Sequence, residues 1–135
     1  MYLPKGIFYD SSTHSIVIAN EGANNVVRWV IGASNWTLLA GSSTGAFGST
    51  SMLLTSPRDV TFDSMGNMYV ADSGNHRIQF FLAGQMNATT IAGISGTRGS
   101  ADDELNGPFS VTIDSQLNLY VSDYYNQRIQ QFVRY

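Results

Sequence analysis

The sequence predicts an all-β fold made of repeated units of four short antiparallel strands, and three observations support this. Segments of the 135-residue chain recur 51 positions apart, which indicates one repeated supersecondary unit. Turn-forming Gly, Ser and Asn are abundant, while the composition typical of long helices is missing. Within a unit, apolar and polar residues alternate over short runs, as in half-buried strands.

The recurrence is strongest in the second and third units. It pairs Pro57–Asp63 with Pro108–Asp114, Asn67–Asp72 with Asn118–Asp123, and Asn75–Gln79 with Asn126–Gln130. A weaker copy precedes them at Pro4–Asp10, Ile16–Asn20 and Asn24–Trp29. One such unit cannot bury its apolar face alone, so the units must pack against one another.

The middle unit shows the expected order of elements. Four strands are predicted at Asp59–Asp63, Met68–Ala71, Arg77–Leu82 and Thr89–Ala92. Gly, Ser, Asn and Asp separate the first three strands and favour tight turns, in which Asp and Asn side chains accept backbone N–H groups. A long Gly-rich link from Gly93 to Gly107 leads to the next unit, and its Leu105 and Pro108 repeat Leu54 and Pro57.

Four strands per unit without a helix indicate the blade of a β-propeller. We place the blades at about residues 3–53, 54–104 and 105–135. The third unit ends after its third strand, so its outer strand is missing and the chain holds about two and three-quarter blades. Both flanks of such an arc would expose apolar surface. The chain is therefore either an excerpt of a longer propeller or a piece that self-associates, and the excerpt is favoured.

The residues from Gly66 to Gln79 read Gly-Asn-Met-Tyr-Val-Ala-Asp-Ser-Gly-Asn-His-Arg-Ile-Gln, and this run resembles the NHL repeat. The resemblance implies a propeller scaffold of about six blades. The first unit departs from the pattern: Asn20 stands where the family has Asp, Val26 stands where it has Arg, and one or two residues are inserted.

The most prominent polar pattern is a structural repeat motif in the turn between the second and third strands. Its members are Asp72, Asn75 and Arg77 in the second unit, Asp123, Asn126 and Arg128 in the third, and Asn20 and Asn24 in the first. A carboxylate beside an arginine could be a catalytic pair or an anion site. Because the set recurs once per blade, we expect it to hold turns and neighbouring strands together.

No catalytic, cofactor or metal site is predicted. His14 and His76 are the only histidines, and a zinc site would need further ligands. The acidic run Asp102–Glu104 lacks the spacing of a calcium loop and is expected to be solvated. Tyr124 and Tyr125 lie in a turn, either as an exposed contact point or packed on the neighbouring blade.

Asn35 and Asn87 each begin an N-glycosylation sequon at equivalent places before the fourth strand. Sugar attachment would place the protein outside the cell, whereas chance occurrence copied by the repeat would leave a cytoplasmic location open. The chain has no Cys, no apolar run of transmembrane length and no signal-peptide pattern at its start.

Three functions fit the sequence. We favour a non-enzymatic binding or assembly module that recognises protein or glycan, and we expect it to be part of an extracellular structural glycoprotein. The alternatives are a metal-dependent propeller enzyme, similar to amidating lyases or lactonases, and an RNA-binding propeller. A formal net charge of −3 with scattered cations argues against a nucleic-acid partner.

Overall fold

The computed structural model describes residues 1–134 as three antiparallel sheets, and the all-β prediction is confirmed. The first sheet contains β1 (Pro4–Asp10), β2 (Ser15–Asn20), β3 (Asn25–Val30) and β4 (Thr37–Gly41). The second contains β5 (Pro57–Phe62), β6 (Met68–Asp72), β7 (Arg77–Phe81) and β8 (Ala88–Gly93). The third contains β9 (Pro108–Ile113), β10 (Leu119–Asp123) and β11 (Arg128–Phe132).

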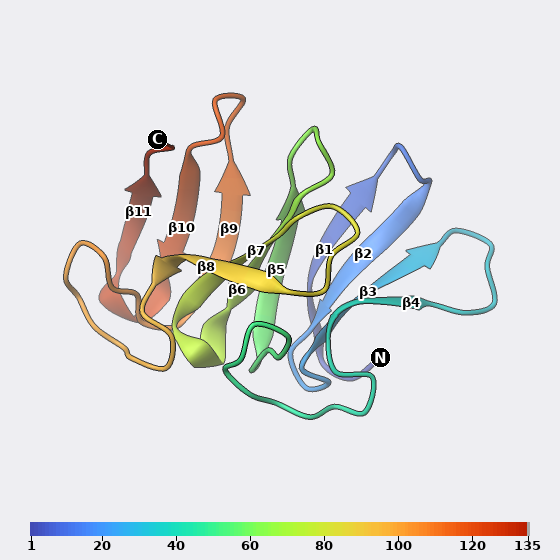
Figure 1. Ribbon diagram of the computed structural model, residues 1–135, viewed down its shortest axis with the longest axis horizontal. Coiled ribbons are helices and arrows are strands. Elements are labelled where there is room, and N and C mark those ends of the chain that lie inside the picture. The colour runs from blue at the N-terminus through green and yellow to red at the C-terminus, as the bar shows by residue number, and fades with distance from the viewer. Residues whose placement is uncertain (135) are drawn as a thin grey trace.

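Each sheet pairs its strands in chain order, and the three sheets stand side by side like blades (Figure 1). The first strands of the sheets, β1, β5 and β9, are neighbours in space. The turns before β7 and β11 are single 3₁₀ turns, Ser73–Asn75 and Tyr124–Asn126. No helix within residues 1–134 has the length and apolar character needed to cross a bilayer.

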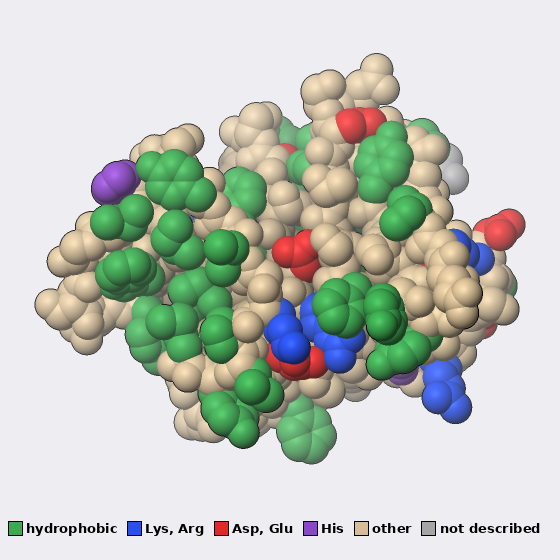
Figure 2. Space-filling model, turned by 180° about the vertical axis from the view of Figure 1, so that it is seen from behind, with side chains coloured by type: hydrophobic (Ala, Val, Ile, Leu, Met, Phe, Trp, Pro, Cys, Tyr) green, Lys and Arg blue, Asp and Glu red, His purple; other side chains and the backbone are tan. Residues whose placement is uncertain are grey.

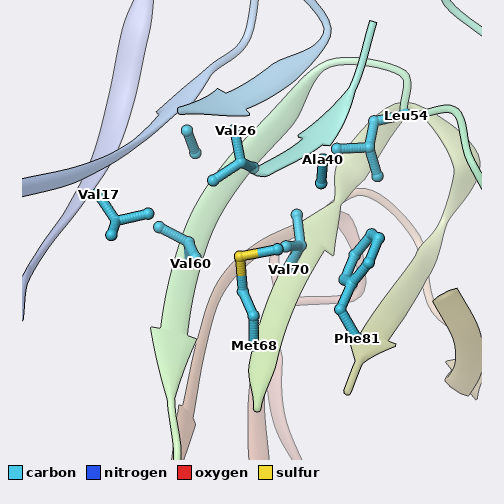
Figure 3. Packing of buried hydrophobic residues seen from close by; sticks show 9 residues of the cluster. Val17, Val26, Ala40, Leu54, Val60, Met68, Val70 and Phe81 are labelled. Atoms are coloured by element: carbon cyan, nitrogen blue, oxygen red, sulfur yellow. The ribbon is translucent and has the colours of Figure 1, made fainter. Parts of the chain in front are cut away.

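The core consists of two apolar layers, one in each space between neighbouring sheets. In the first layer, Val17 and Val26 of the first sheet meet Val60, Val70 and Phe81 of the second (Figure 3). The second layer uses the equivalent positions one unit later, with Tyr69 and Ile78 packed against Val111, Leu119 and Val121. Full burial of one such side chain stabilises the fold by about 1.5–3 kcal/mol, so the sheets are held mainly by their faces.

Each link between two sheets contributes one buried leucine to a core layer. Leu54 lies in the link between the first and second sheets, and Leu105 lies in the link between the second and third. Both side chains are fully buried, in the first and second layers respectively. The Leu that precedes the Pro of each unit therefore anchors the link at its entry into the next blade.

Candidate functional site

The turn between β6 and β7 is organised by a buried carboxylate. Asp72 Oδ1 accepts the backbone N–H of Thr55 at 2.7 Å, and Asp72 Oδ2 accepts Asn75 Nδ2 and Arg77 Nε, both at 2.8 Å. The side chains of Asp72 and Arg77 are 0% and 3% exposed. Both carboxylate oxygens therefore have donors from the protein, and neither is open to solvent.

The guanidinium of Arg77 ties the turn to the preceding link. Its Nη atoms donate to the backbone carbonyls of Ser49, Thr50 and Leu53 at 2.8–3.0 Å and to Ser95 Oγ at 3.0 Å. A planar group with five N–H donors can make this many bonds at once, which a lysine could not do.

The third blade repeats the arrangement. Asp123 accepts the N–H of Asn106 at 2.7 Å, together with Asn126 Nδ2 and Arg128 Nε at 2.8 Å. Arg128 donates to the carbonyls of Ser100, Ala101 and Glu104. The side chain of Arg128 is 26% exposed, because its outer side lacks a covering strand.

The hydrogen bonds of Asp72, Asn75 and Arg77 form a bracket that connects the turn to the link. Burial raises the pKa of the Asp72 carboxyl, and the donors from Asn75, Thr55 and Arg77 offset part of that rise. Three protein donors bond to the carboxylate, and its complete burial keeps a metal ion or a substrate from reaching it.

A second repeated network, which the sequence analysis missed, closes the first hairpin of the second and third blades. Asp63 accepts the N–H groups of Met65 and Asn67, the side-chain amide of Asn67 and the hydroxyl of Tyr69. Burial and the adjacent carboxylate raise the pKa of Tyr69 to about 12. The same bonds recur at Asp114, where Gln116, Asn118 and Tyr120 are the donors. The repeated order Asp, Asn, Tyr was the available sequence signal.

Asp59 and His76 of the second blade form hydrogen bonds to the third blade. Asp59 Oδ2 accepts Ser110 Oγ at 2.6 Å and the N–H of Val111 at 3.0 Å, so it links the inner strands β5 and β9. His76 Nδ1 accepts the N–H of Gly107 at 3.0 Å. Their partners lie in the next blade, so the spacing within one unit does not indicate these contacts.

An aromatic–cationic ridge, defined here as Lys5, Glu21, Arg58, Phe109, Tyr124 and Tyr125, crosses all three blades. Glu21 pairs with Lys5 at 3.3 Å and with Arg58 at 2.9 Å. The guanidinium of Arg58 lies 4.3 Å from the ring centre of Phe109. The rings of Phe109 and Tyr124 are 4.9 Å apart, and those of Tyr124 and Tyr125 are 5.0 Å apart. Tyr124 and Tyr125 thus pack on their own blade and remain 54% and 60% exposed.

The family model of the NHL repeat matches residues 54–81 and 105–132. These two segments hold the turn brackets and the hairpin networks described above. The chain carries NHL repeats. The NHL resemblance noted in the sequence is confirmed.

Solved structures establish the fold around these NHL repeats. The chain is similar to an auxiliary nutrient binding protein from Bacteroides ovatus, with a TM-score of 0.74, 16% identity, and coverage of 93% of this chain and 36% of that one. It is also similar to a chain of a nidogen/laminin complex (TM-score 0.70, 20% identity, 96% and 43% covered) and to a streptogramin B lyase (0.67, 13%, 97% and 37%).

The neighbours are β-propellers, so the predicted propeller segment is confirmed. At these identities the likeness concerns the fold alone. The chain spans well under half of the length of each of these structures. No curated protein matches the chain.

In the first unit, the residue that replaces the NHL arginine is one position earlier than the sequence analysis placed it. Asn20 pairs with Asn25 in the register in which Asp72 pairs with Arg77, so Asn25, and not Val26, occupies the arginine position. Val26 is fully buried in the core, and strand alternation fixes it there.

Asn24 is consequently not the counterpart of Asn75. It has a φ of 52°, close to the 56° of His76 and the 54° of Gln127, and it occupies their left-handed turn position. The turn has no insertion. One extra residue lies in the hairpin from Asp10 to Ser15, which is one position longer than the hairpin from Asp63 to Asn67.

In place of the ion pair, the first blade has two amides. Asn20 Nδ2 donates to Asn25 Oδ1 at 3.0 Å, and Asn25 Nδ2 donates to the carbonyl of Ser42 at 2.9 Å. Asn24 Nδ2 donates to the carbonyl of Gly45, and its Oδ1 accepts the N–H of Ser56. These amides hold the first link against the turn with neutral groups.

The remaining polar candidates are dispersed. His14 Nδ1 is 3.1 Å from the hydroxyl of Tyr9, and His76 bonds to Gly107 in another blade. In the acidic run, Glu104 Oε2 accepts the N–H of Ala101 within its own loop. Among residues 1–134, no three His, Cys, Asp or Glu side chains are grouped so that they could hold a metal ion.

Both sequons lie where a glycan could be attached. Asn35 and Asn87 are exposed. Asn35 lies two residues before the start of β4, and Asn87 lies directly before β8, so both are in the loops that lead into the fourth strands. Asn87 Oδ1 is 3.4 Å from Ser51 Oγ. These loops are at the opposite strand ends from the turns that carry Tyr124 and Tyr125.

Proposed function

We propose that this chain belongs to a larger propeller that acts as a non-enzymatic binding and assembly module. The observation that carries the proposal is the exposure of core positions at both ends of the arc. Ile129 occupies the position of Ile78, yet the two residues are 70% and 0% exposed. Ile7 occupies the position of Val60, and these are 70% and 2% exposed.

We expect these exposed apolar sheet faces to be covered by another blade or by a second copy of the chain. Figure 2 shows hydrophobic side chains gathered over the side of the molecule that the first sheet occupies. A soluble protein rarely leaves such surface uncovered, and burying it against another blade would stabilise the assembly by about 25 cal/mol per Å².

The cavities between blades support the same conclusion. A pocket of about 280 Å³ lies between the first and second blades and is lined in part by the loop Gly84–Met86 before β8. Its counterpart between the second and third blades measures about 880 Å³ and is lined by Phe80, Ile91 and Phe132. We infer that a loop and a fourth strand, paired to the free edge of β11, would fill this space.

A binding role also agrees with the polar chemistry. The two brackets and two hairpin networks bond inward, while exposed aromatic side chains remain on the turns. Exposed Tyr near Arg is typical of protein interfaces. The structural neighbours include a nutrient binding protein and a chain of a nidogen/laminin complex, and they also include a streptogramin B lyase.

We further propose that Asn35 and Asn87 carry N-linked sugar and that the protein is extracellular. The exposure of both side chains supports this. Expression through a secretory pathway, followed by intact mass before and after glycosidase treatment, tests it. A mass loss that disappears in Asn35→Gln and Asn87→Gln variants is expected, and an unmodified wild-type chain contradicts it.

The assembly proposal is tested by the intact mass and sedimentation of the native molecule. A polypeptide longer than 135 residues, or a stable complex of copies, is expected. A solitary, compact chain of this length in dilute solution would overturn the proposal. Metal analysis of the purified protein then separates a binding module from an enzyme, because the metal-dependent alternative requires a stoichiometric ion.

A further inference from the structure

The tyrosines of the ridge are not needed to form the turn that carries them. The turn Tyr124–Asn126 and its counterpart Ser73–Asn75 have the same geometry, with a left-handed residue closing each turn at φ 54° and 56°. In the second blade, Ser73 and Gly74 occupy the tyrosine positions. The scaffold therefore tolerates Ser-Gly here, and the two aromatic rings are available for another role.

The charged part of the ridge has a surplus of donors. Lys5 and Arg58 share the single carboxylate of Glu21, so the three side chains carry a net charge of +1. The side chain of Lys5 is 44% exposed, and within residues 1–134 Arg58 Nη1 has no hydrogen-bond acceptor. This end of the ridge can accept one further carboxylate.

The rings of the ridge lie at angles to one another and do not form a flat platform. The rings of Tyr124 and Tyr125 are at 84° to each other, and Tyr124 is tilted by 41° on Phe109. A sugar ring stacks best on an open, flat aromatic face. Two perpendicular rings instead fit a compact apolar side chain such as proline or leucine, with the hydroxyl groups at the rim.

We propose that the aromatic–cationic ridge binds an acidic peptide segment of a partner protein, in which Asp or Glu lies next to Pro or an aliphatic residue. The apolar side chain packs against the exposed rings of Tyr124 and Tyr125, and the carboxylate pairs with Lys5 and Arg58. This inference rests on the proposed binding function and specifies the face and the chemistry of the partner.

The tyrosines should supply most of the affinity and the charges most of the selectivity. Buried aromatic anchors dominate interface energetics, whereas exposed ion pairs contribute little. We therefore expect Tyr124→Ser combined with Tyr125→Gly to weaken binding by about tenfold or more. Lys5→Glu should weaken it by about threefold and remove part of its salt dependence.

The experiment is a selection from a random peptide library displayed on phage against the immobilised protein. Enriched peptides should contain an acidic residue beside Pro, Leu, Ile or Val, and they should lose binding to the Ser-Gly variant. That variant installs the turn of the second blade, and circular dichroism checks that it folds. Tyr9→Ser is the matched control, because Tyr9 is similarly exposed (52%) and lies outside the ridge.

The outcomes separate this inference from the proposed function. If selected peptides bind the Ser-Gly variant unchanged, the protein is a binding module but the ridge is not its site. Enrichment of basic or purely apolar peptides overturns the proposed chemistry. A tyrosine-dependent response to acidic sugars on a glycan array, without peptide enrichment, assigns the ridge to a glycan. If nothing binds at any face, both proposals fail.

Discussion

Replacing Arg77 by Ala should destabilise the fold far more than replacing Arg128 by Ala, although both residues make the same bracket. Arg77→Ala removes the charged donor from a carboxylate that is 0% exposed and leaves the carbonyls of Ser49, Thr50 and Leu53 without their donors. Breaking a buried ion pair by deleting one partner costs about 3–5 kcal/mol. We expect a loss of this size in the free energy of unfolding.

For Arg128→Ala the expected loss is smaller, about 1–2 kcal/mol, because a partly exposed ion pair is worth less than a buried one. The side chain of Arg128 is 26% exposed, so water can replace the guanidinium. Urea unfolding monitored by far-ultraviolet circular dichroism measures both losses.

A further variant isolates the charge from the shape. Replacing the pair together, by Asp72→Leu with Arg77→Met, should recover the part of the loss that comes from the unpaired buried charge. The carbonyls of Ser49, Thr50 and Leu53 stay without donors, so the recovery should be incomplete. Equal losses for the two Arg→Ala variants would refute the argument that burial sets the cost. A loss below about 1 kcal/mol for Arg77→Ala would show that water reaches Asp72 after all.

The remaining predictions concern packing, pH and the open edge. Leu54→Ala should lower the free energy of unfolding by about 2–5 kcal/mol in a urea titration, because Leu54 is fully buried in the first core layer; a loss below 1 kcal/mol would show that the link does not anchor there. Burial and the nearby Arg98 lower the pKa of His76 from 6.5, against the opposing effects of Asp123 and Asp72. The unfolded chain then takes up the proton first, so stability should be full above pH 6.5 and fall below it, and His76→Gln should remove this part of the slope. If the wild type and His76→Gln lose stability equally as the pH falls below 6.5, His76 is not the group responsible. Appending a copy of residues 85–93 after Tyr135 should complete the third sheet and raise the thermal midpoint, whereas a scrambled copy should not.

The strands could be predicted because three independent signals coincide in each unit. In the second blade, alternation, turn residues and the repeat all place strands near the observed β5, β6, β7 and β8, with boundaries that differ by at most two residues. The buried Leu54 and Leu105 could be anticipated from their shared place before Pro. Local patterning is sufficient here because each strand pairs with its neighbour in sequence.

The first unit shows where residue matching fails. Matching by residue type aligned Asn24 with Asn75, since both are asparagines in a turn. The structure aligns Asn24 with His76, because Val26 must face the core and strand pairing then fixes every other position. Asn, His and Gln all occupy this left-handed position in the three blades, so the residue type at Asn24 did not reveal the misalignment.

Contacts between blades could not be predicted from one unit. Asp59 bonds to Ser110, and the two residues occupy the same position in successive blades. In the first blade that position is Gly6, which lies close against the backbone of Arg58 and Asp59. The same position is therefore a close-packed glycine in the first blade, a hydrogen-bond acceptor in the second and a donor in the third. These roles depend on how neighbouring inner strands pack, which the sequence of one unit does not show.

These features divide the surface of the arc into regions with separate physical demands. The sheet faces at the two ends expose Ile7 and Ile129 and require apolar neighbours. The turn ends carry the ridge, whose tyrosines can be exchanged for Ser-Gly without a cost to the turn, while the opposite strand ends carry Asn35 and Asn87. Changes on the turn ends should therefore alter recognition without altering assembly, and changes at the end faces should do the reverse. A substitution at Tyr124 and Tyr125 that shifts the oligomeric state would show that this division is wrong, because the ridge would then be part of the blade packing.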